Sequence, residues 1–77
     1  MQADQLQQVF GANVRRRRLE LGITQGELAR RAGVPQPNIS DIENGKQSPT
    51  FPTLARIAEA LSIPPSHLLS AEVLAQM

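Results

Sequence analysis

The sequence predicts a single all-α domain of five short helices, spanning residues 1–77. Three observations indicate this fold class. Apolar residues recur three and four positions apart, the spacing that places them on one side of a helix. Helix start and stop signals alternate along the chain, with polar capping residues before the apolar segments and glycine or proline after them. No stretch of the sequence shows the strict alternation of polar and apolar residues that is typical of a half-buried strand.

The composition narrows the class of protein. With 40% hydrophobic residues, the 77-residue chain can bury a core, although folding hides only about 60% of the surface of so small a domain. It has no cysteine, which excludes a disulfide framework, and its one histidine cannot complete a metal site without several carboxylates. The sequence also lacks a nucleophile paired with a base and a glycine-rich phosphate loop. We therefore expect no enzyme activity, no metal and no cofactor.

Location and charge give weaker indications. No apolar segment approaches the roughly 20 residues that span a bilayer, and the N-terminus lacks the order of a signal peptide, so we expect a cytoplasmic protein. Residues 1–34 hold six arginines against three acidic residues, and residues 35–77 hold two basic against four acidic residues. This asymmetry is compatible with binding to a polyanion. A basic run such as residues 15–18, however, more often forms a solvated helix face.

The first helix is expected over residues 4–21. Asp4 and Gln7 have the spacing of a helix N-cap and its third helical residue, and Gly22 then ends the helix. Arg17 and Arg18 lie at the two edges of the apolar stripe, so one of them is expected to point inward. The stripe itself carries Leu6, Phe10, Val14 and Leu21.

The second helix is expected to begin after Thr24. Thr24 and Glu27 have the spacing of a capping box, in which each side chain bonds to the backbone N–H of the other residue. The helix ends at Gly33, which adopts the left-handed conformation without steric cost. Its inward residues are Leu28, Ala29 and Ala32.

The third helix is expected over residues 36–44, with Ile39 and Ile42 directed inward and Asn44 at its C-terminal stop. Pro35 and Pro37 are compatible with a helix only in its first turn, where no intrahelical N–H is lost.

Two further helices complete the domain. Thr50 is expected to cap the fourth helix, whose first turn contains Pro52. The buried stripe of that helix carries Leu54, Ile57, Ala58 and Leu61. The prolines at positions 64 and 65 break the chain, and a fifth helix then carries Leu68 and Leu69.

Residues 25–44 form the most informative stretch. They predict two short helices joined by a turn at Gly33, with the small residue Ala29 where the helices cross. This spacing fits the helix-turn-helix arrangement, in which the outer face of the second helix enters a DNA major groove. With the two isoleucines inward, Pro37, Asp41 and Asn44 point outward, whereas periodicity does not fix the direction of Gln36.

Residues 10–69 resemble the Cro/repressor-type, or XRE-like, helix-turn-helix family of bacterial and phage transcription regulators. The matching segments are TQGELA at 24–29, AGV at 32–34, ISDIENGK at 39–46 and LARIAEAL at 54–61. The resemblance implies a compact, five-helix, lambda-repressor-like domain that binds double-stranded DNA.

The resemblance also implies roles for residues of the motif. It implies that Gln25 holds a DNA phosphate and braces Gln36. The positions at which the family reads base edges are occupied here by Gln36, Pro37, Asn38 and Asp41. Phosphate contacts are implied for Thr24, Gln25, Ser40, Asn44 and Lys46.

Arg18 and Glu43 are expected to form a structural ion pair. Each lies at the edge of the inward face of its helix, and an inward charge needs a partner because an unpaired one is costly to bury. The family resemblance selects the same pair.

The C-terminal tail, residues 70–77, is a candidate dimer segment. The end of the chain offers more apolar surface than a lone helix needs, through Leu68, Leu69, Val73 and Leu74. Core packing is the alternative role for these residues. A two-fold dimer would hold two recognition helices about 34 Å apart, one turn of duplex.

We therefore expect a sequence-specific regulator that acts by occupancy, most simply a repressor, as a homodimer on a near-palindromic operator. An activator, or a controller that both activates and represses, stays open. So does an antitoxin-like protein that binds DNA and also a protein partner. A pure protein-interaction module is the alternative from another class.

Overall fold

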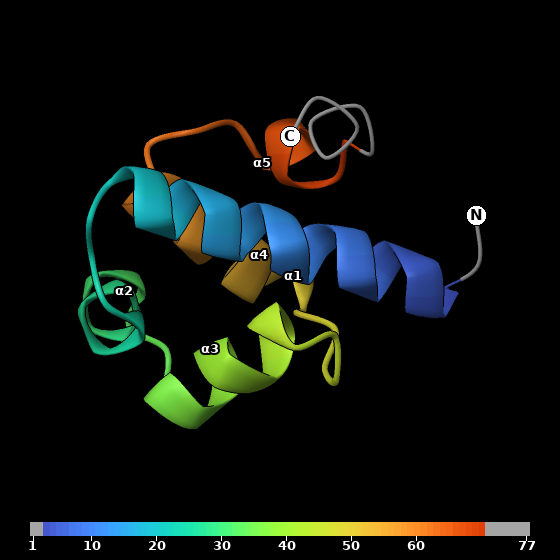
Figure 1. Cartoon of the computed structure of the whole chain (residues 1–77), viewed down its shortest axis with the longest axis horizontal. Coiled ribbons are helices and arrows are strands. Elements are labelled where there is room, and N and C mark those ends of the chain that lie inside the picture. Colours follow the sequence, from blue (N-terminus) through green and yellow to red (C-terminus); the bar gives the residue numbers. More distant parts are fainter. Residues whose placement is uncertain (1–2, 71–77) are drawn as a thin grey trace.

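The computed structural model describes residues 3–70, and within them it contains only helices (Figure 1). The helices are α1 (Ala3–Glu20), α2 (Gln25–Ala32), α3 (Gln36–Glu43), α4 (Phe51–Ala60) and α5 (Pro65–Leu68). The predicted all-α class is confirmed. In the domain, which measures 30 × 22 × 19 Å, α3 and α5 lie on opposite sides of α1. Within residues 3–70, no helix combines the length and apolar character needed to cross a membrane.

The long helix α1 differs from its prediction at both ends. Phe10 and Val14 are buried, but Leu6 and Leu21 are exposed, so the predicted four-residue stripe is wrong at its ends. Leu21 lies in the turn after α1, where the chain changes direction. Asp4 is not the N-cap, because α1 already includes it, and its Oδ1 accepts a hydrogen bond from the N–H of Gln5.

The caps of α2 are partly as predicted. The Thr24 hydroxyl accepts a hydrogen bond of 3.0 Å from the N–H of Glu27, and Gly33 closes the helix with φ of 68°. The reciprocal half of the capping box is wrong, because the Glu27 carboxylate accepts instead from the side chains of Arg30 and Arg31. A charged donor forms a stronger hydrogen bond with a carboxylate than a neutral N–H does.

The hydrogen bonds of Glu27 with Arg30 and Arg31 predict that the Glu27 carboxyl group takes up its proton only at low pH. Hydrogen bonds from Arg30 and then Arg31 lower the pKa of the Glu27 carboxyl group from 4.5 to about 2. A carboxyl group whose pKa is lower in the folded chain stabilises the fold above its unfolded pKa and loses that contribution as the pH falls toward the folded value. An NMR titration of the Glu27 carboxyl carbon should give a midpoint near 2. A midpoint near 4.5 would show that the cluster does not form in solution.

The core is formed where the five helices meet. Thr50 caps α4 as predicted, since its hydroxyl accepts a hydrogen bond from the N–H of Thr53. Leu54, which was expected in the buried stripe of α4, is only half-buried. Leu69 is exposed, and Val73 and Leu74 lie outside the described residues. The largest apolar side chains that are almost fully buried are Phe10, Val14, Leu28, Ile39, Ile42, Ile57, Leu61 and Leu68.

Two residues of α1 position its neighbours in ways that the sequence analysis missed. A Cβ atom built on Gly11 would lie 2.1 Å from the carbonyl oxygen of Ile42, so α1 and α3 cross too closely for any side chain at that position. Asn13 is fully buried, and its amide donates hydrogen bonds to the carbonyl oxygens of Leu68, at 2.7 Å, and Ser70, at 3.2 Å. Gly11 therefore sets the position of α3, and Asn13 ties the end of α5 to α1.

Candidate nucleic-acid interface

The turn between α2 and α3 holds the two helices in a fixed relation. Gly33 takes the left-handed conformation, and the next residue, Val34, is buried and donates its N–H to the carbonyl oxygen of Ala29 at 3.0 Å. Ala29 and Ala32 are buried where α2 meets the core, and their small side chains allow close approach. The turn therefore fixes the direction in which the chain leaves α2 and enters α3.

The side chains of α3 divide into an inner and an outer set. Ile39 and Ile42 are buried in the core. Gln36, Pro37 and Asp41 are exposed, and Figure 1 shows that the first turn of α3 lies at the edge of the molecule. The structure thus leaves three of the four predicted base-reading residues exposed to solvent. The fourth, Asn38, is half-buried, as is the predicted phosphate ligand Ser40.

The start of α3 accommodates its prolines. Pro35 is the N-cap, and its carbonyl oxygen accepts hydrogen bonds from the N–H groups of Asn38 and Ile39. Pro37 lies in the first turn, as predicted, where its missing N–H breaks no helical bond. The side chain of Gln36, whose direction the sequence left open, lies against the first turn of α2, with its Oε1 3.2 Å from a Cβ built on Gly26.

A buried ion pair fixes the C-terminal end of α3. The Nε of Arg18 lies 2.7 Å from Oε2 of Glu43, and Nη2 lies 3.0 Å from Oε1, so the contact is bidentate. Arg18 also donates to the carbonyl oxygen of Ile23. The predicted pair is therefore present, and its hydrogen bonds raise the pKa of Arg18. Arg17, the other candidate for an inward arginine, donates instead to the carbonyl oxygen of Leu61.

Gln25 does not have the partner that the sequence analysis assigned to it. Its amide Nε2 donates a hydrogen bond of 3.1 Å to Oε1 of Glu43, and no hydrogen bond joins it to Gln36 within residues 3–70. In this structure Gln25 therefore bonds to Glu43, and its bracing of Gln36 on DNA stays a prediction. The Glu43 carboxylate is a charged acceptor, which forms a stronger hydrogen bond with the amide than a neutral side chain would.

Most of the basic residues are already paired. Ion pairs join Arg16 and Arg17 to Glu20, Arg18 to Glu43, and Arg30 and Arg31 to Glu27. The exposed Lys46, in the turn after α3, has no carboxylate partner among the described residues. Its N–H bonds to the carbonyl oxygen of Asp41 at 2.8 Å, which holds the turn against the end of the helix. Lys46 therefore offers an uncompensated positive charge beside α3.

Comparison with known proteins identifies the family. A family model described as helix-turn-helix matches residues 14–68, which is most of the chain and includes both helices of the motif. This chain belongs to the helix-turn-helix family. The match, together with the relatives described below, confirms the XRE-type resemblance found in the sequence.

Relatives of this helix-turn-helix protein are named as transcriptional regulators. It is 38% identical over 63 residues to an uncharacterized HTH-type transcriptional regulator of Sinorhizobium fredii, covering 82% of this chain and 79% of the relative. It is 43% identical over 61 residues to the HTH-type transcriptional repressor RghR of Bacillus subtilis, covering 78% of this chain and 45% of the relative. The protein is thus a member of a family of DNA-binding transcription regulators.

Solved structures agree with this assignment. The DNA-binding domain of the P22 c2 repressor superposes with a TM-score of 0.77 and 32% identity, covering 82% of this chain and 83% of that one. The restriction-modification controller protein C.AhdI of Aeromonas hydrophila gives a TM-score of 0.78 and 27% identity, covering 80% of this chain and 94% of that one. The lambda-repressor-like fold of the helix-turn-helix protein is therefore confirmed.

Proposed function

We propose that the protein is a sequence-specific, double-stranded DNA-binding repressor that acts as a homodimer on a near-palindromic operator. One observation carries this proposal: α3 is fixed to the core by Ile39 and Ile42 while Gln36, Pro37 and Asp41 stay exposed at the edge of the domain. A helix that reads DNA needs both properties, because its outer side chains must meet base edges in the major groove in one register.

The exposed residues of α3 match particular base edges. Gln36, or the half-buried Asn38, can form two hydrogen bonds with adenine, one through its amide oxygen and one through its amide nitrogen. Asp41 can accept a hydrogen bond from the amino group of cytosine, and Pro37 can offer an apolar contact to the methyl group of thymine. The carboxylate of Asp41 is repelled by phosphates, so its use at this surface is to discriminate between bases rather than to add affinity.

Phosphate contacts would position α3 on the duplex. Lys46 supplies the unpaired charge, and the exposed Asn44 belongs to the same turn. Gln25 uses one amide hydrogen on Glu43, which leaves its second amide hydrogen for a phosphate oxygen. Thr24 accepts a hydrogen bond but keeps its own hydroxyl hydrogen as a donor, and Ser40 lies half-buried beside the exposed face.

The mode of regulation follows from the proposed binding. A domain of this size that covers an operator represses by occupying it, and RghR is named a repressor. C.AhdI is named a restriction-modification controller protein, and the similarity to it supports a second candidate, a controller protein. In that role the chain would bind DNA through the same surface of α3. Either role places the protein in the cytoplasm, where bacterial and phage DNA is transcribed.

The Gln36→Ala substitution tests the base-reading role. At the cognate duplex we expect a loss of about 1–3 kcal/mol of binding free energy, because a bidentate contact to one base is removed. On duplexes of unrelated sequence the affinity should change little. Titration of fluorescent duplexes with the wild-type and variant proteins measures both values. Equal losses on every duplex would contradict a base-reading role for this residue.

Lys46→Ala is the matched control for that experiment. It should weaken binding to all duplexes about equally and reduce the slope of log K against log salt by about 1 per domain. The salt series also tests the alternative functions. DNA binding through several phosphates should weaken on the order of a thousandfold between low and moderate salt, whereas an apolar contact in a protein-interaction module should not.

A further inference from the structure

Two exposed side chains of α3 lie one helical turn apart and carry different chemistry. Pro37 presents an apolar ring that neither donates nor accepts a hydrogen bond, and Asp41 presents a carboxylate. Residues four positions apart in a helix are neighbours on its surface. The Cα–Cβ bonds of a helix tilt toward its N-terminus, so the carboxylate of Asp41 is directed back toward the turn that holds Pro37. The two groups therefore form one contact surface, the Pro37–Asp41 pair.

The carboxylate of Asp41 is available to a hydrogen-bond donor. Among residues 3–70 it has no hydrogen-bond or ion-pair partner, whereas guanidinium groups occupy the carboxylates of Glu27 and Glu43. Its backbone is held in place, because the carbonyl oxygen of Asp41 accepts a hydrogen bond of 2.8 Å from the N–H of Lys46. DNA phosphates repel a carboxylate at this surface. Asp41 therefore needs a base that offers a donor.

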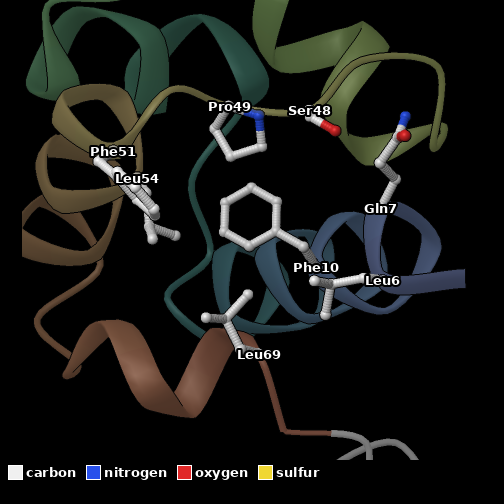
Figure 2. A pocket seen from close by; sticks show the side chains of 8 residues that line it. All are labelled: Leu6, Gln7, Phe10, Ser48, Pro49, Phe51, Leu54 and Leu69. Atoms are coloured by element: carbon white, nitrogen blue, oxygen red, sulfur yellow. The ribbon is translucent and has the colours of Figure 1, made fainter. Parts of the chain in front are cut away.

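Pro37 is the apolar group among the residues predicted to contact DNA, since all the others carry hydrogen-bonding side chains. Figure 2 shows three exposed apolar side chains on another surface, where Leu6, Phe51 and Leu69 border an apolar hollow that no residue of α3 lines. Leu68 is instead fully buried, so the predicted dimer contact through Leu68 is wrong, because that side chain belongs to the core. A methyl group in the major groove would thus meet Pro37 rather than the hollow.

We propose that the Pro37–Asp41 pair reads 5-methylcytosine, so that the protein binds an operator carrying this modified base more tightly than the unmodified sequence. The inference rests on the proposed function, because it names a base that the outer face of α3 prefers. 5-Methylcytosine carries an amino group on C4 and a methyl group on the adjacent C5, and both face the major groove. The amino group donates to Asp41 while the methyl group packs against Pro37.

No unmodified base pair presents these two groups side by side. Cytosine offers the amino donor without a methyl group, and in an A·T pair the O4 acceptor of thymine lies between the thymine methyl and the adenine amino group. A thymine in the neighbouring base pair could supply a methyl group to Pro37, but its O4 would lie next to the cytosine amino group and repel the carboxylate of Asp41. Methylated cytosine brings the methyl group without an added acceptor.

Wild-type protein and modified duplexes test this inference without any change to the fold. In the operator found by selection from random duplexes, each cytosine of one half-site is replaced in turn by 5-methylcytosine or thymine, and fluorescence titration gives the dissociation constants. At one position 5-methylcytosine should bind about fourfold more tightly than cytosine, the gain from burying one methyl group. Thymine at the same position should bind on the order of tenfold more weakly, because it presents an acceptor to the carboxylate.

Two substitutions assign these preferences to the Pro37–Asp41 pair. Pro37→Ser replaces the apolar ring by a hydroxyl group and should bind cytosine and 5-methylcytosine equally. Asp41→Asn should lose the discrimination against thymine, because an amide can donate to O4, and should keep the preference for the methyl group. The matched control is Pro35→Ser, which changes the exposed proline that precedes α3 as its N-cap. This control should keep both preferences of the wild type.

DNA binding separates failure of this inference from failure of the proposed function. A wild type that binds no duplex selectively would refute the proposed function, and this inference with it. A wild type that binds its operator selectively, but no more tightly when any of its cytosines is methylated, would overturn the inference and leave the proposed function intact. So would a preference for the methyl group that Pro37→Ser retains, because another residue would then contact that group.

Discussion

Replacing Arg18 with methionine is expected to lower the free energy of unfolding by about 3–5 kcal/mol, the usual cost of removing one partner of a buried ion pair. The side chain of Glu43 is only 2% exposed, so water could not replace the lost guanidinium group. The carboxylate would keep only the amide of Gln25 as a hydrogen-bond partner. A domain of this length has a total stability of about 4–12 kcal/mol. The loss is therefore a large fraction of the total stability, and the variant should unfold at a markedly lower temperature and urea concentration than the wild type.

Urea denaturation followed by circular dichroism measures this loss. Arg31→Met is the matched control, because the ion pair between Arg31 and Glu27 lies at the surface and should contribute less than about 1 kcal/mol. Adding Glu43→Leu to Arg18→Met should restore much of the stability, since the unpaired buried charge is then removed. A loss below 1 kcal/mol for Arg18→Met alone would show that the pair is not buried in solution.

The second large effect is expected at Gly11. Gly11→Ala should destabilise the domain by about 3 kcal/mol, at the upper end of the cost of overpacking a core. Alanine is the better helix former by about 1 kcal/mol, but its Cβ would lie 2.1 Å from the backbone oxygen of Ile42. The backbone of α3 cannot rotate out of the way as a side chain can, so α1 and α3 must separate.

A second glycine provides the control for that substitution. Gly26 also lies inside a helix, but a Cβ there would meet side chains rather than backbone, the end of the Gln36 side chain at 3.2 Å and the Thr24 hydroxyl at 3.8 Å. Gly26→Ala should therefore change the stability by less than about 1 kcal/mol, helped by the helix propensity of alanine. Thermal and urea unfolding of the two variants give the comparison. Equal stability of Gly11→Ala and the wild type would contradict the close crossing of α1 and α3.

Much of the fold could be predicted because local chemistry marks the ends of the helices. Thr24, Gly33 and Thr50 act on backbone groups within a few residues of themselves, so their roles are legible in the sequence. The inward direction of Ile39 and Ile42 follows from helical periodicity alone. Glu27 shows the limit of such local patterns, because Arg30 and Arg31 lie one turn further along the helix and compete for its carboxylate.

The features that escaped prediction depend on contacts between elements. Asn13 is a buried polar residue whose amide nitrogen donates to carbonyl groups more than 50 positions away in the chain. Gly11 interrupts a helical pattern without being at its end, a signal that often marks close packing, but only the position of α3 explains it. Similarly, the acceptor of Gln25 could not be predicted before Glu43 was placed beside it.

For the candidate DNA-binding surface, too, the sequence predicted directions on one helix but not contacts between helices. Periodicity placed Pro37 and Asp41 outward, and the structure agrees. It could not show that Gln36 lies against α2, because that contact depends on how α2 and α3 meet. Nor could it show that Leu68 is core while Phe51 is open, because these outcomes depend on how α4 and α5 dock on α1.

Selection of bound sites from a pool of random duplexes tests most directly whether the outer face of α3 reads base sequence. The account predicts enrichment of two inverted half-sites whose centres lie about 10 base pairs apart. The same selection with Gln36→Ala should lose the preference at one position of each half-site while keeping the others. A pool that shows no enriched sequence after repeated rounds with the wild-type protein would contradict the account.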